Sequence, residues 1–310
     1  MRPQSSRMRD CSQTRASDAI ELNLPFKSPY DWQTIIRFYQ SHSIPEVERV
    51  TEDSFTRAFR LENTIGCVRV RAIAGKPRLK VRIVPEDPKV RLEVVRRVRK
   101  MFDVDCDPLL IAQSFERIPL LARLCRRFPG LRLPRGWDPF ETAICSILGQ
   151  LVSASQRANL IGQLVSNYGE QIADPVALEK IHLFPSAEVL ARSDLSAVKT
   201  TIVRREAIRE FSRRVLSGAI SLADAQDPAL FRKALLETPG LGSWSAEYIS
   251  LRAIGDTDAF PRTDLILKRV LKLHPDLDLA RIKPWRAYAA TYLWRQFAST
   301  LSKNKKVKLT

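Results

Sequence analysis

The hydrophobic pattern of the first third of the chain is that of a small mixed α/β module. Residues 30–39 place apolar side chains on one face of an amphipathic helix. After this helix, three segments alternate polar and apolar residues, as half-buried antiparallel strands do: 54–61, 66–73 and 78–84. The alternation therefore predicts an antiparallel sheet with a helix packed against it.

From Pro88 onward the period becomes helical, beginning with a highly basic stretch that ends before Asp103. Short runs of Pro, Gly, Ser or Asp separate the helical segments that follow. These segments are 139–168, 186–193, 195–217, 228–237, 243–254, 263–273 and 284–300. The sequence thus predicts an α+β protein, in which a small N-terminal antiparallel β-sheet/α module is followed by an all-α body.

The predicted organisation has three parts and no internal repeat. Residues 1–20 are polar, rich in Ser and Arg, and without apolar periodicity, so we expect a disordered tail there. The mixed α/β domain occupies residues 21–87, and the helical region occupies residues 88–310. A basic stretch at 303–308 is interpreted as a solvated end.

The chain carries a large excess of positive charge, with 51 Lys and Arg against 34 Asp and Glu and a formal net charge of +17. This balance favours a polyanionic partner, of which nucleic acid is the leading candidate. A solvated basic surface and attraction to anionic lipid are the alternatives. Because no long apolar segment or signal-peptide core is present, we expect a soluble, intracellular protein without a membrane partner.

The cysteines and histidines suggest no metal or disulfide chemistry. Five cysteines are scattered, odd in number and free of any C-x-x-C pair, which predicts reduced thiols. They are Cys11, Cys67, Cys106, Cys125 and Cys145. The three histidines share no metal-ligand spacing and lie near no nucleophile motif.

The strongest local motif is the turn 238–242, Thr-Pro-Gly-Leu-Gly, between an apolar helix end and a new helix. Gly240 and Gly242 tolerate positive φ and let another backbone approach, while amides at a helix N-terminus favour phosphate. The turn therefore suits sequence-independent DNA binding. A plain connection between two helices is the alternative, since Gly and Pro are common there too.

Asp264 follows 22 positions after Gly242 and opens an amphipathic helix. Asp is a favoured N-cap residue, so Asp264 can be explained as a helix start, a task that Thr263 could also perform. Capping and catalysis are compatible, and the aspartate stays a candidate for both.

Taken with Asp264 and the turn 238–242, which we call the hairpin, four further segments resemble the 3-methyladenine DNA glycosylase II family of the helix-hairpin-helix DNA glycosylase superfamily. They are 140–141 (Phe-Glu), 147–153 (Ile-Leu-Gly-Gln-Leu-Val-Ser), 29–32 (Pro-Tyr-Asp-Trp) and 284–289 (Pro-Trp-Arg-Ala-Tyr-Ala). The resemblance runs in order from about residue 22 to residue 297. It implies a helical body whose two lobes flank a base-accepting cleft.

The resemblance also implies roles for single residues. Asp264 would be the catalytic residue, in its ionised form, and Leu151 the wedge that fills the gap left by a flipped nucleotide. Four aromatic residues would line the base pocket: Phe38, Trp244, Tyr248 and Trp294. The hairpin would bind phosphate through Pro239, Gly240, Leu241, Gly242 and Ser243. Backbone carbonyls would hold a monovalent Na⁺ or K⁺ ion at Leu236, Thr238 and Leu241.

Each of these roles has a plain structural alternative, because the aromatic residues and Leu151 could equally be core residues. For the pocket there is a chemical reason: N-alkylated purines are cationic, and aromatic faces attract cations. The expected function is therefore excision of alkylated, 3-methyladenine-type bases. A glycosylase for oxidised or deaminated bases and a non-catalytic DNA-binding protein are the alternatives.

Residues that other branches of the superfamily carry, and that this chain lacks, restrict the expected type of glycosylase. Bifunctional relatives carry a Schiff-base lysine where this chain has Trp244, so we expect a monofunctional enzyme without lyase activity, and Lys268 is assigned to phosphate or solvent. With no cysteine after Cys145, no iron–sulfur cluster and no required cofactor are expected. Thr263 and Leu265 depart from the family's Asp-Asp-Tyr, which puts a direct transfer of substrate preference in doubt. We expect a cytoplasmic, bacterial-type monomer that binds double-stranded DNA containing damaged bases.

Overall fold

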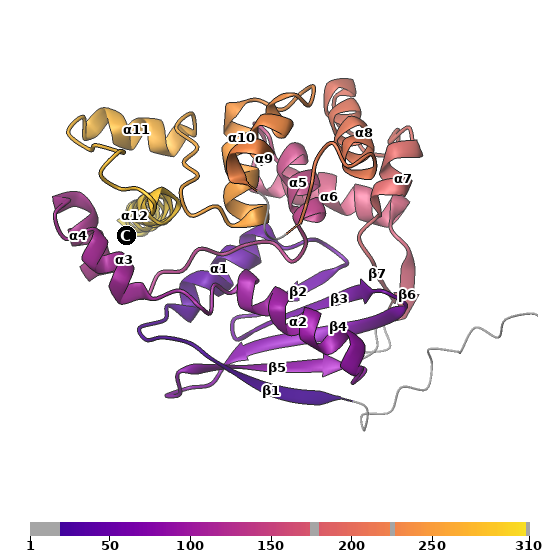
Figure 1. The fold of residues 1–310 in the computed structure, drawn as a ribbon, viewed down its shortest axis with the longest axis horizontal. Helices are drawn as coiled ribbons and strands as arrows, with labels where there is room; N and C mark the ends of the chain where they lie inside the picture. Colours follow the sequence, from indigo (N-terminus) through magenta and orange to yellow (C-terminus); the bar gives the residue numbers. More distant parts are fainter. Residues whose placement is uncertain (1–18, 174–179, 224–226, 308–310) are drawn as a thin grey trace, which may run out of the picture.

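The computed structural model describes residues 19–173, 180–223 and 227–307. Its N-terminal part is a five-stranded antiparallel sheet with strand order β1-β5-β4-β3-β2 (Figure 1). The strands are β1 (Ile20–Pro25), β2 (Glu48–Val50), β3 (Ser54–Leu61), β4 (Thr64–Ala72) and β5 (Arg78–Val84). The alternation in β3, β4 and β5 correctly predicted these three strands, whereas the short edge strands β1 and β2 were not foreseen.

One face of the sheet is covered by α1 (Trp32–His42) and α2 (Pro88–Met101). Every second residue of the strands points into this core, as Val68 and Val70 do in β4, and both are fully buried. On α2 the buried residues lie three or four positions apart, which is the spacing of one helix face. The sheet and these two helices therefore share a single hydrophobic core.

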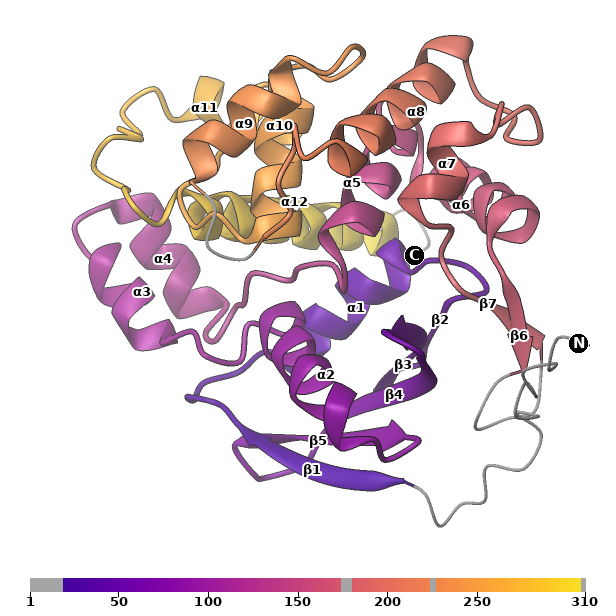
Figure 2. The same cartoon turned by 45° about the vertical axis from the view of Figure 1, so that its right-hand side comes forward.

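The remaining chain forms two helical lobes with separate cores (Figure 2). The larger lobe contains α5 (Pro139–Leu148), α6 (Ala154–Tyr168), α7 (Ala187–Arg192), α8 (Ile202–Leu216), α9 (Pro228–Leu236) and α10 (Ser243–Ile249), which continues as a π-helical turn, η3 (Ser250–Ile254). The smaller lobe contains α3 (Pro108–Ser114), α4 (Pro119–Arg127), α11 (Leu265–Leu273) and α12 (Arg286–Val307). A two-stranded hairpin, β6 (Gln171–Ala173) and β7 (Lys180–His182), follows α6.

Four of the helices begin with the same Asp-Pro pair: α2, α3, α5 and α9. The aspartate is the N-cap and accepts a backbone N–H of the first turn, as Asp138 does from Phe140 at 2.8 Å. The proline that follows has no N–H to leave unpaired and has the φ angle of a helix. For α2, α5 and α9, these pairs explain why the predicted helical segments begin where the helices do.

Two predicted helices are interrupted. The segment 139–168 breaks between α5 and α6 because Leu151 has a left-handed backbone, with φ 54°. The segment 195–217 starts late, since Leu195 also has positive φ (57°) and the side chain of Thr201 caps α8. Both predictions were wrong because hydrophobic periodicity continues across a local reversal of the backbone.

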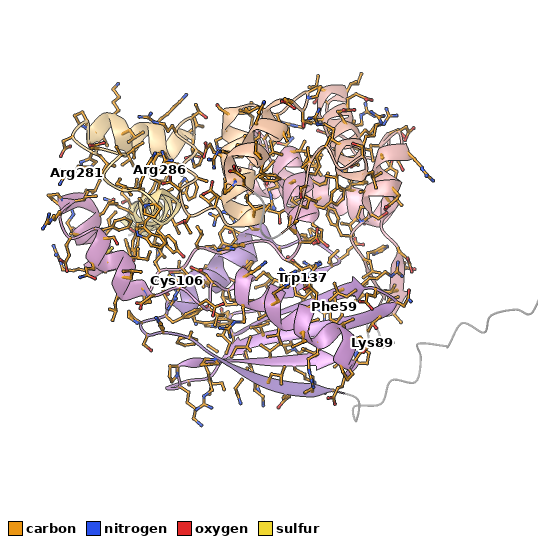
Figure 3. The ribbon with its side chains drawn as sticks, viewed as in Figure 1. Phe59, Lys89, Cys106, Trp137, Arg281 and Arg286 are labelled. Carbon is orange, nitrogen blue, oxygen red and sulfur yellow. The ribbon has the colours of Figure 1, made fainter. Side chains whose placement is uncertain are left out.

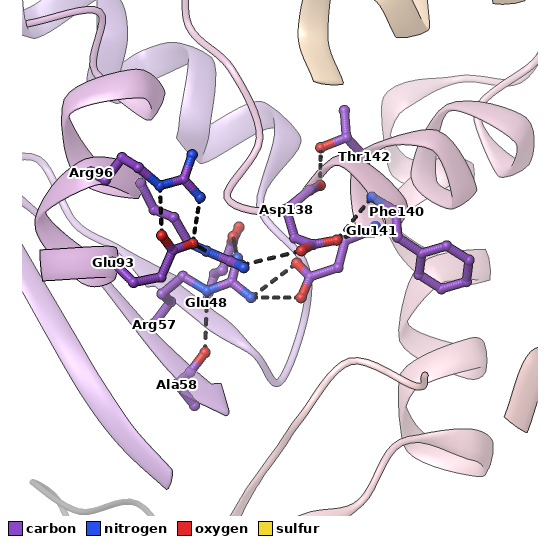
Figure 4. Close-up of polar contacts among 10 residues, drawn as sticks. Glu48, Arg57, Ala58, Glu93, Arg96, Asp138, Phe140, Glu141 and Thr142 are labelled. Carbon is purple, nitrogen blue, oxygen red and sulfur yellow. Dashed lines mark hydrogen bonds and ion pairs between the residues drawn. The ribbon is translucent and has the colours of Figure 1, made fainter. Parts of the chain in front are cut away.

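A buried ion triad joins the sheet domain to the larger lobe (Figure 4). Arg57 on β3 is only 2% exposed. Its guanidinium donates to Glu48 at 2.8 Å and, with one nitrogen, to both carboxylate oxygens of Glu141 on α5 at 2.9 and 3.1 Å. Trp137 packs beside the triad, stacked on Phe59 (Figure 3). The position of α5, and of the loop after it, is therefore tied to the sheet.

Two further expectations concern the state of the cysteines and the presence of membrane-spanning helices. Cys67, Cys106, Cys125 and Cys145 are free thiols, and Cys11, like most of the predicted N-terminal tail, lies outside the described residues. Within the described ranges, every helix is too short or too polar to cross a bilayer.

Candidate active site

A cavity of about 600 Å³ lies where the two helical lobes meet α1. Its walls come from α1, the loop after α5, α10 with its π-helical turn, the start of α11 and α12. It is lined by the predicted catalytic aspartate and by all four predicted pocket aromatics: Asp264, Phe38, Trp244, Tyr248 and Trp294. The fold therefore brings together, in a space of ligand-binding size, residues that lie far apart in the sequence.

Asp264 is the N-cap of α11 and is held by four N–H donors. Its Oδ1 accepts the backbone N–H groups of Ile266 at 3.0 Å and Leu267 at 3.1 Å, and the indole N–H of Trp294 at 3.0 Å. Its Oδ2 accepts only the indole N–H of Trp244, at 3.3 Å. The same side chain therefore caps α11 and lines the cavity. Because Oδ2 has the fewer donors, it has acceptor capacity left for a further group.

The aromatic residues form a continuous surface beside the aspartate. Trp244 and Tyr248, four positions apart on α10, stack with their centroids 5.0 Å apart and their planes at 11°. Trp294 from α12 meets the edge of Tyr248 at 6.2 Å. All four predicted aromatics are partly buried and line the cavity, and Phe38 and Trp294 also pack against neighbouring cores.

Arg252 is a cavity residue that the sequence reasoning missed. It is only 6% exposed, and its guanidinium carbon lies 4.6 Å from the ring centroid of Phe38, 5.3 Å from that of Trp294 and 5.5 Å from that of Tyr248. The signal was present as the spacing of four in Trp244, Tyr248 and Arg252, which continues one helix face into the π-helical turn. The aromatic faces thus already contact a cation that belongs to the protein.

His42 is a second cavity residue for which the sequence suggested no role. It stacks on Phe38 with centroids 4.1 Å apart and planes at 12°. Burial, with the nearby guanidinium of Arg157, lowers the pKa of His42 to about 3, so the imidazole is neutral at physiological pH. Because its Nδ1 lies 2.9 Å from the carbonyl oxygen of Phe38, which can only accept, this nitrogen carries the proton.

The hairpin between α9 and α10 is built around a buried threonine. Thr238 is 1% exposed, and its carbonyl accepts the N–H of Leu241 at 3.1 Å. Gly240 has φ 84°, and a Cβ there would lie 2.9 Å from the Cβ of Ala207, so this glycine is required by the fold. Gly242 has φ −98° and open space where its Cβ would be. Of the two glycines expected to tolerate positive φ, only Gly240 adopts it.

Leu151 lies at the predicted wedge position and is not a core residue. Its side chain is 96% exposed, and its φ of 54° is strained for a residue with a Cβ. The neighbouring Gln150 connects this loop to the hairpin, because its side-chain amide donates to the hydroxyl of Ser245 at 2.7 Å and to the carbonyl of Gly240 at 3.3 Å. The exposed leucine and the hairpin are therefore held at a fixed separation.

Two residues that raised doubts lie away from the cavity. Leu265 is 78% exposed and does not line it, whereas the next residue, Ile266, does. Leu265 therefore contributes no side chain to the cavity wall. Lys268 is exposed and does not line the cavity either. Within the described part of the chain, no cluster of His, Cys, Asp or Glu is arranged to hold a metal ion.

Comparison with known proteins relates the chain to DNA repair proteins. Residues 21–138 match the family model described as the AlkA N-terminal domain. The chain is 30% identical over 295 residues to the probable bifunctional transcriptional activator/DNA repair enzyme AlkA of Mycobacterium tuberculosis (strain CDC 1551 / Oshkosh), which covers 91% of this chain and 58% of that protein. It therefore spans little more than half of that relative. It is 29% identical over 281 residues to DNA-3-methyladenine glycosylase 2 of Escherichia coli (strain K12), covering 87% of this chain and 95% of that protein.

The fold agrees with these similarities. A 3-methyladenine DNA glycosylase from Archaeoglobus fulgidus superposes with a TM-score of 0.73 over 88% of this chain and 96% of that chain, at 18% sequence identity. The two proteins thus share the N-terminal sheet followed by a helical body. The chain thus contains an AlkA N-terminal domain at residues 21–138 and, over most of its length and in its fold, is similar to 3-methyladenine DNA glycosylases.

Proposed function

We propose that this protein is a DNA glycosylase that flips a damaged base out of duplex DNA and hydrolyses its N-glycosidic bond. The observation that carries the proposal is Asp264, fixed by two helix amides and two indole N–H groups in the wall of an aromatic cavity. An exposed leucine and a glycine hairpin accompany this cavity, and they would serve as the wedge and the phosphate contact beside a base pocket.

The chemistry needs little beyond a carboxylate. As the base leaves, the sugar develops positive charge, which Oδ2 of Asp264 stabilises and which an attacking water then neutralises. The fixed hydrogen bonds to Trp244 and Trp294 hold the carboxylate so that it need not reorganise during the reaction. Leu151 fills the space from which the nucleotide has left, which offsets an unstacking cost of a few kcal/mol.

The substrates proposed are alkylated purines of the 3-methyladenine type. Relatives that bear the name DNA-3-methyladenine glycosylase support this choice. An N-alkylated purine is cationic and departs as a neutral base, so it requires no general acid. Among the described residues that line the cavity, Asp264 is the one carboxylate, which fits such a reaction.

The same cavity argues for a monofunctional enzyme. A lyase needs a lysine amine to form a Schiff base with the sugar. The described cavity lining contains no lysine, and Trp244 stands at the position of the nucleophile, with its indole bound to Asp264. We therefore propose hydrolysis of the base without strand cleavage.

Phosphate would be bound at the hairpin, where the N-cap residue Gly242 has no side chain to occupy the amides of the first turn of α10. The carbonyls of Leu236, Thr238 and Leu241 would hold a monovalent cation beside that phosphate. The carbonyl of Thr238 accepts one hydrogen bond and keeps a second lone pair, which is compatible with a cation ligand. Counterion release should make DNA binding weaken steeply with salt.

The test compares Asp264→Asn with Asp107→Asn, in release of free base from methylated duplex DNA. Asp107 caps α3 through two backbone amides at 3.0 and 3.3 Å, much as Asp264 caps α11, but it does not line the cavity. We expect Asp264→Asn to bind DNA with unchanged affinity and to release no base, and Asp107→Asn to behave as wild type. Base release by Asp264→Asn at the wild-type rate would refute the mechanism.

The alternatives give different results in the same assay. A non-catalytic DNA-binding protein would shift DNA without freeing any base. A panel of single-lesion duplexes with 3-methyladenine, 8-oxoguanine, hypoxanthine or uracil would identify an enzyme for oxidised or deaminated bases. Borohydride treatment should trap no covalent adduct, whereas a trapped adduct would show that a lyase step exists.

A further inference from the structure

Arg252 is a buried cation to which no described residue offers a carboxylate partner. Within the described residues its side chain forms one hydrogen bond, from Nη1 to the carbonyl of Pro134 at 2.8 Å. Its Nε is buried and has no hydrogen-bond partner in the described part of the chain. Burial of an unpaired charge is unfavourable, and the cation–π contacts offset this cost only in part.

An apolar residue could pack against three aromatic rings at lower cost, so packing alone does not explain an arginine here. Two hydrogen bonds connect Arg252 to the 134–136 segment. Its Nη1 donates to the carbonyl of Pro134 at 2.8 Å, and its backbone carbonyl accepts the N–H of Gly136 at 3.0 Å. The guanidinium thus has a fixed position in the cavity wall, where burial of its charge is unfavourable.

Arg252 and Asp264 face the same cavity and share one neighbour. Trp294 donates its indole N–H to Asp264 and presents its ring to the guanidinium of Arg252. The two charges therefore lie on opposite parts of a single indole, the carboxylate at its N–H edge and the guanidinium over its ring. A base against these rings would lie next to Arg252, with its sugar toward Asp264.

We propose that Arg252 assists the departure of the base by acting on the charge that the base gains, which rests on the proposed glycosylase function. When the C1′–N bond breaks, its electron pair leaves with the base and the sugar becomes cationic. A cationic lesion base becomes neutral, and a neutral lesion base becomes an anion that then takes a proton from water. Water adds to C1′ and loses its proton to Asp264 or solvent. In both cases the charge on the base changes by minus one, which a fixed guanidinium favours.

For the two kinds of lesion, Arg252 should affect different steps of the reaction. For a neutral base, Arg252 does not affect binding but stabilises the transition state, in which negative charge develops. For a cationic base, Arg252 weakens binding of the lesion by repulsion, and the repulsion is relieved as the bond breaks. Removal of the charge should therefore slow the bound-state reaction for both lesions, but tighten binding only of the cationic one.

The experiment uses single-turnover excision from duplexes with 7-methylguanine as the cationic lesion and hypoxanthine as the neutral one. Enzyme titration gives a maximal rate and a half-saturating concentration for each. Arg252→Met removes the charge, Arg252→Lys keeps it, and Arg269→Met is the matched control. Arg269 also contacts an aromatic ring, that of Phe297 at 5.6 Å, but lies outside the cavity lining.

We expect Arg252→Met to lower the maximal rate for both lesions by about 100-fold, the range for loss of one fixed electrostatic group. The half-saturating concentration should fall for 7-methylguanine and stay constant for hypoxanthine. Arg252→Lys should recover most of the rate, and Arg269→Met should match wild type. Wild-type rates in Arg252→Met, or slower reaction with weaker binding of both lesions, would overturn the proposal and make Arg252 a packing residue. If the wild-type enzyme frees neither base, the proposed glycosylase function itself fails.

Discussion

The buried triad of Glu48, Arg57 and Glu141 allows a stability prediction with a definite sign. Two carboxylates share one guanidinium, and burial raises the pKa of Glu141 to about 7, with repulsion from Asp138 and Glu48 adding to the effect of burial. The folded protein therefore holds a proton on Glu141 that the unfolded chain, with a pKa of 4.5, releases earlier. Because the folded state binds more protons between these values, stability should be lost as the pH rises from 4.5 through 7.

The magnitude follows from the two pKa values. Each pH unit between them is worth about 1.4 kcal/mol, so the loss for Glu141 is at most about 3–4 kcal/mol. Glu141→Gln mimics the protonated acid and should remove this loss. It should match wild type near pH 5 and exceed it at pH 8. Arg57→Met, by contrast, leaves two buried carboxylates without their cation and should cost about 3–5 kcal/mol at pH 8.

The assay is equilibrium unfolding in urea at several pH values between 5 and 8, with Glu170→Gln as the control. Glu170 forms an exposed ion pair with Arg60 at 2.6 Å, so its loss should change stability by less than about 0.5 kcal/mol at every pH. The difference between wild type and Glu141→Gln cancels the titration of other groups. Parallel pH profiles for these two proteins would refute the reasoning.

Three further predictions concern the cavity and its loops. Gly240→Ala should destabilise the protein by about 1–3 kcal/mol in urea unfolding, because Gly240 has positive φ and lies close to Ala207. Gly242→Ala should keep the stability of the protein but weaken DNA binding in a gel-shift assay, because its methyl group would occupy the open space at the hairpin. Leu151→Gly should raise unfolding stability by up to about 1 kcal/mol and lower the rate of base release; equal rates would exclude a wedge. The pKa of His42 is about 3 in the folded protein against 6.5 in the unfolded chain, so its contribution to stability should be full above pH 6.5 and should decrease as the pH falls toward 3. His42→Gln should make stability depend less on pH in this range, as measured by acid unfolding.

Much of the fold could be predicted because local signals decided it. The alternation in 54–61 and 78–84 matches β3 and β5 at both ends, since one buried face and one exposed face leave a period of two in the sequence. Helix starts followed Asp-Pro pairs for a local reason as well. The reversals at Leu151 and Leu195 were not predictable from periodicity, because leucine suits a helix and only the surrounding contacts impose positive φ.

The site was predictable to a similar extent. The resemblance placed Asp264 and the four aromatics, and the cavity brings all of them together. Arg252 was not found, because its position depends on a π-helical turn and on the 134–136 segment, which lies more than one hundred positions earlier in the chain. His42 was missed for a similar reason, because its burial and its lowered pKa depend on tertiary contacts and cannot be read from the neighbouring sequence.

The amide of Gln150 has a consequence for how DNA would be read. Because it connects the loop of Leu151 to Gly240 and Ser245, the exposed leucine and the hairpin cannot move independently. In the proposed function, a phosphate bound at the hairpin would therefore place Leu151 at a constant number of nucleotides along the strand. Scanning would proceed by whole-nucleotide steps, and a lesion one position out of register would be passed over until the next step.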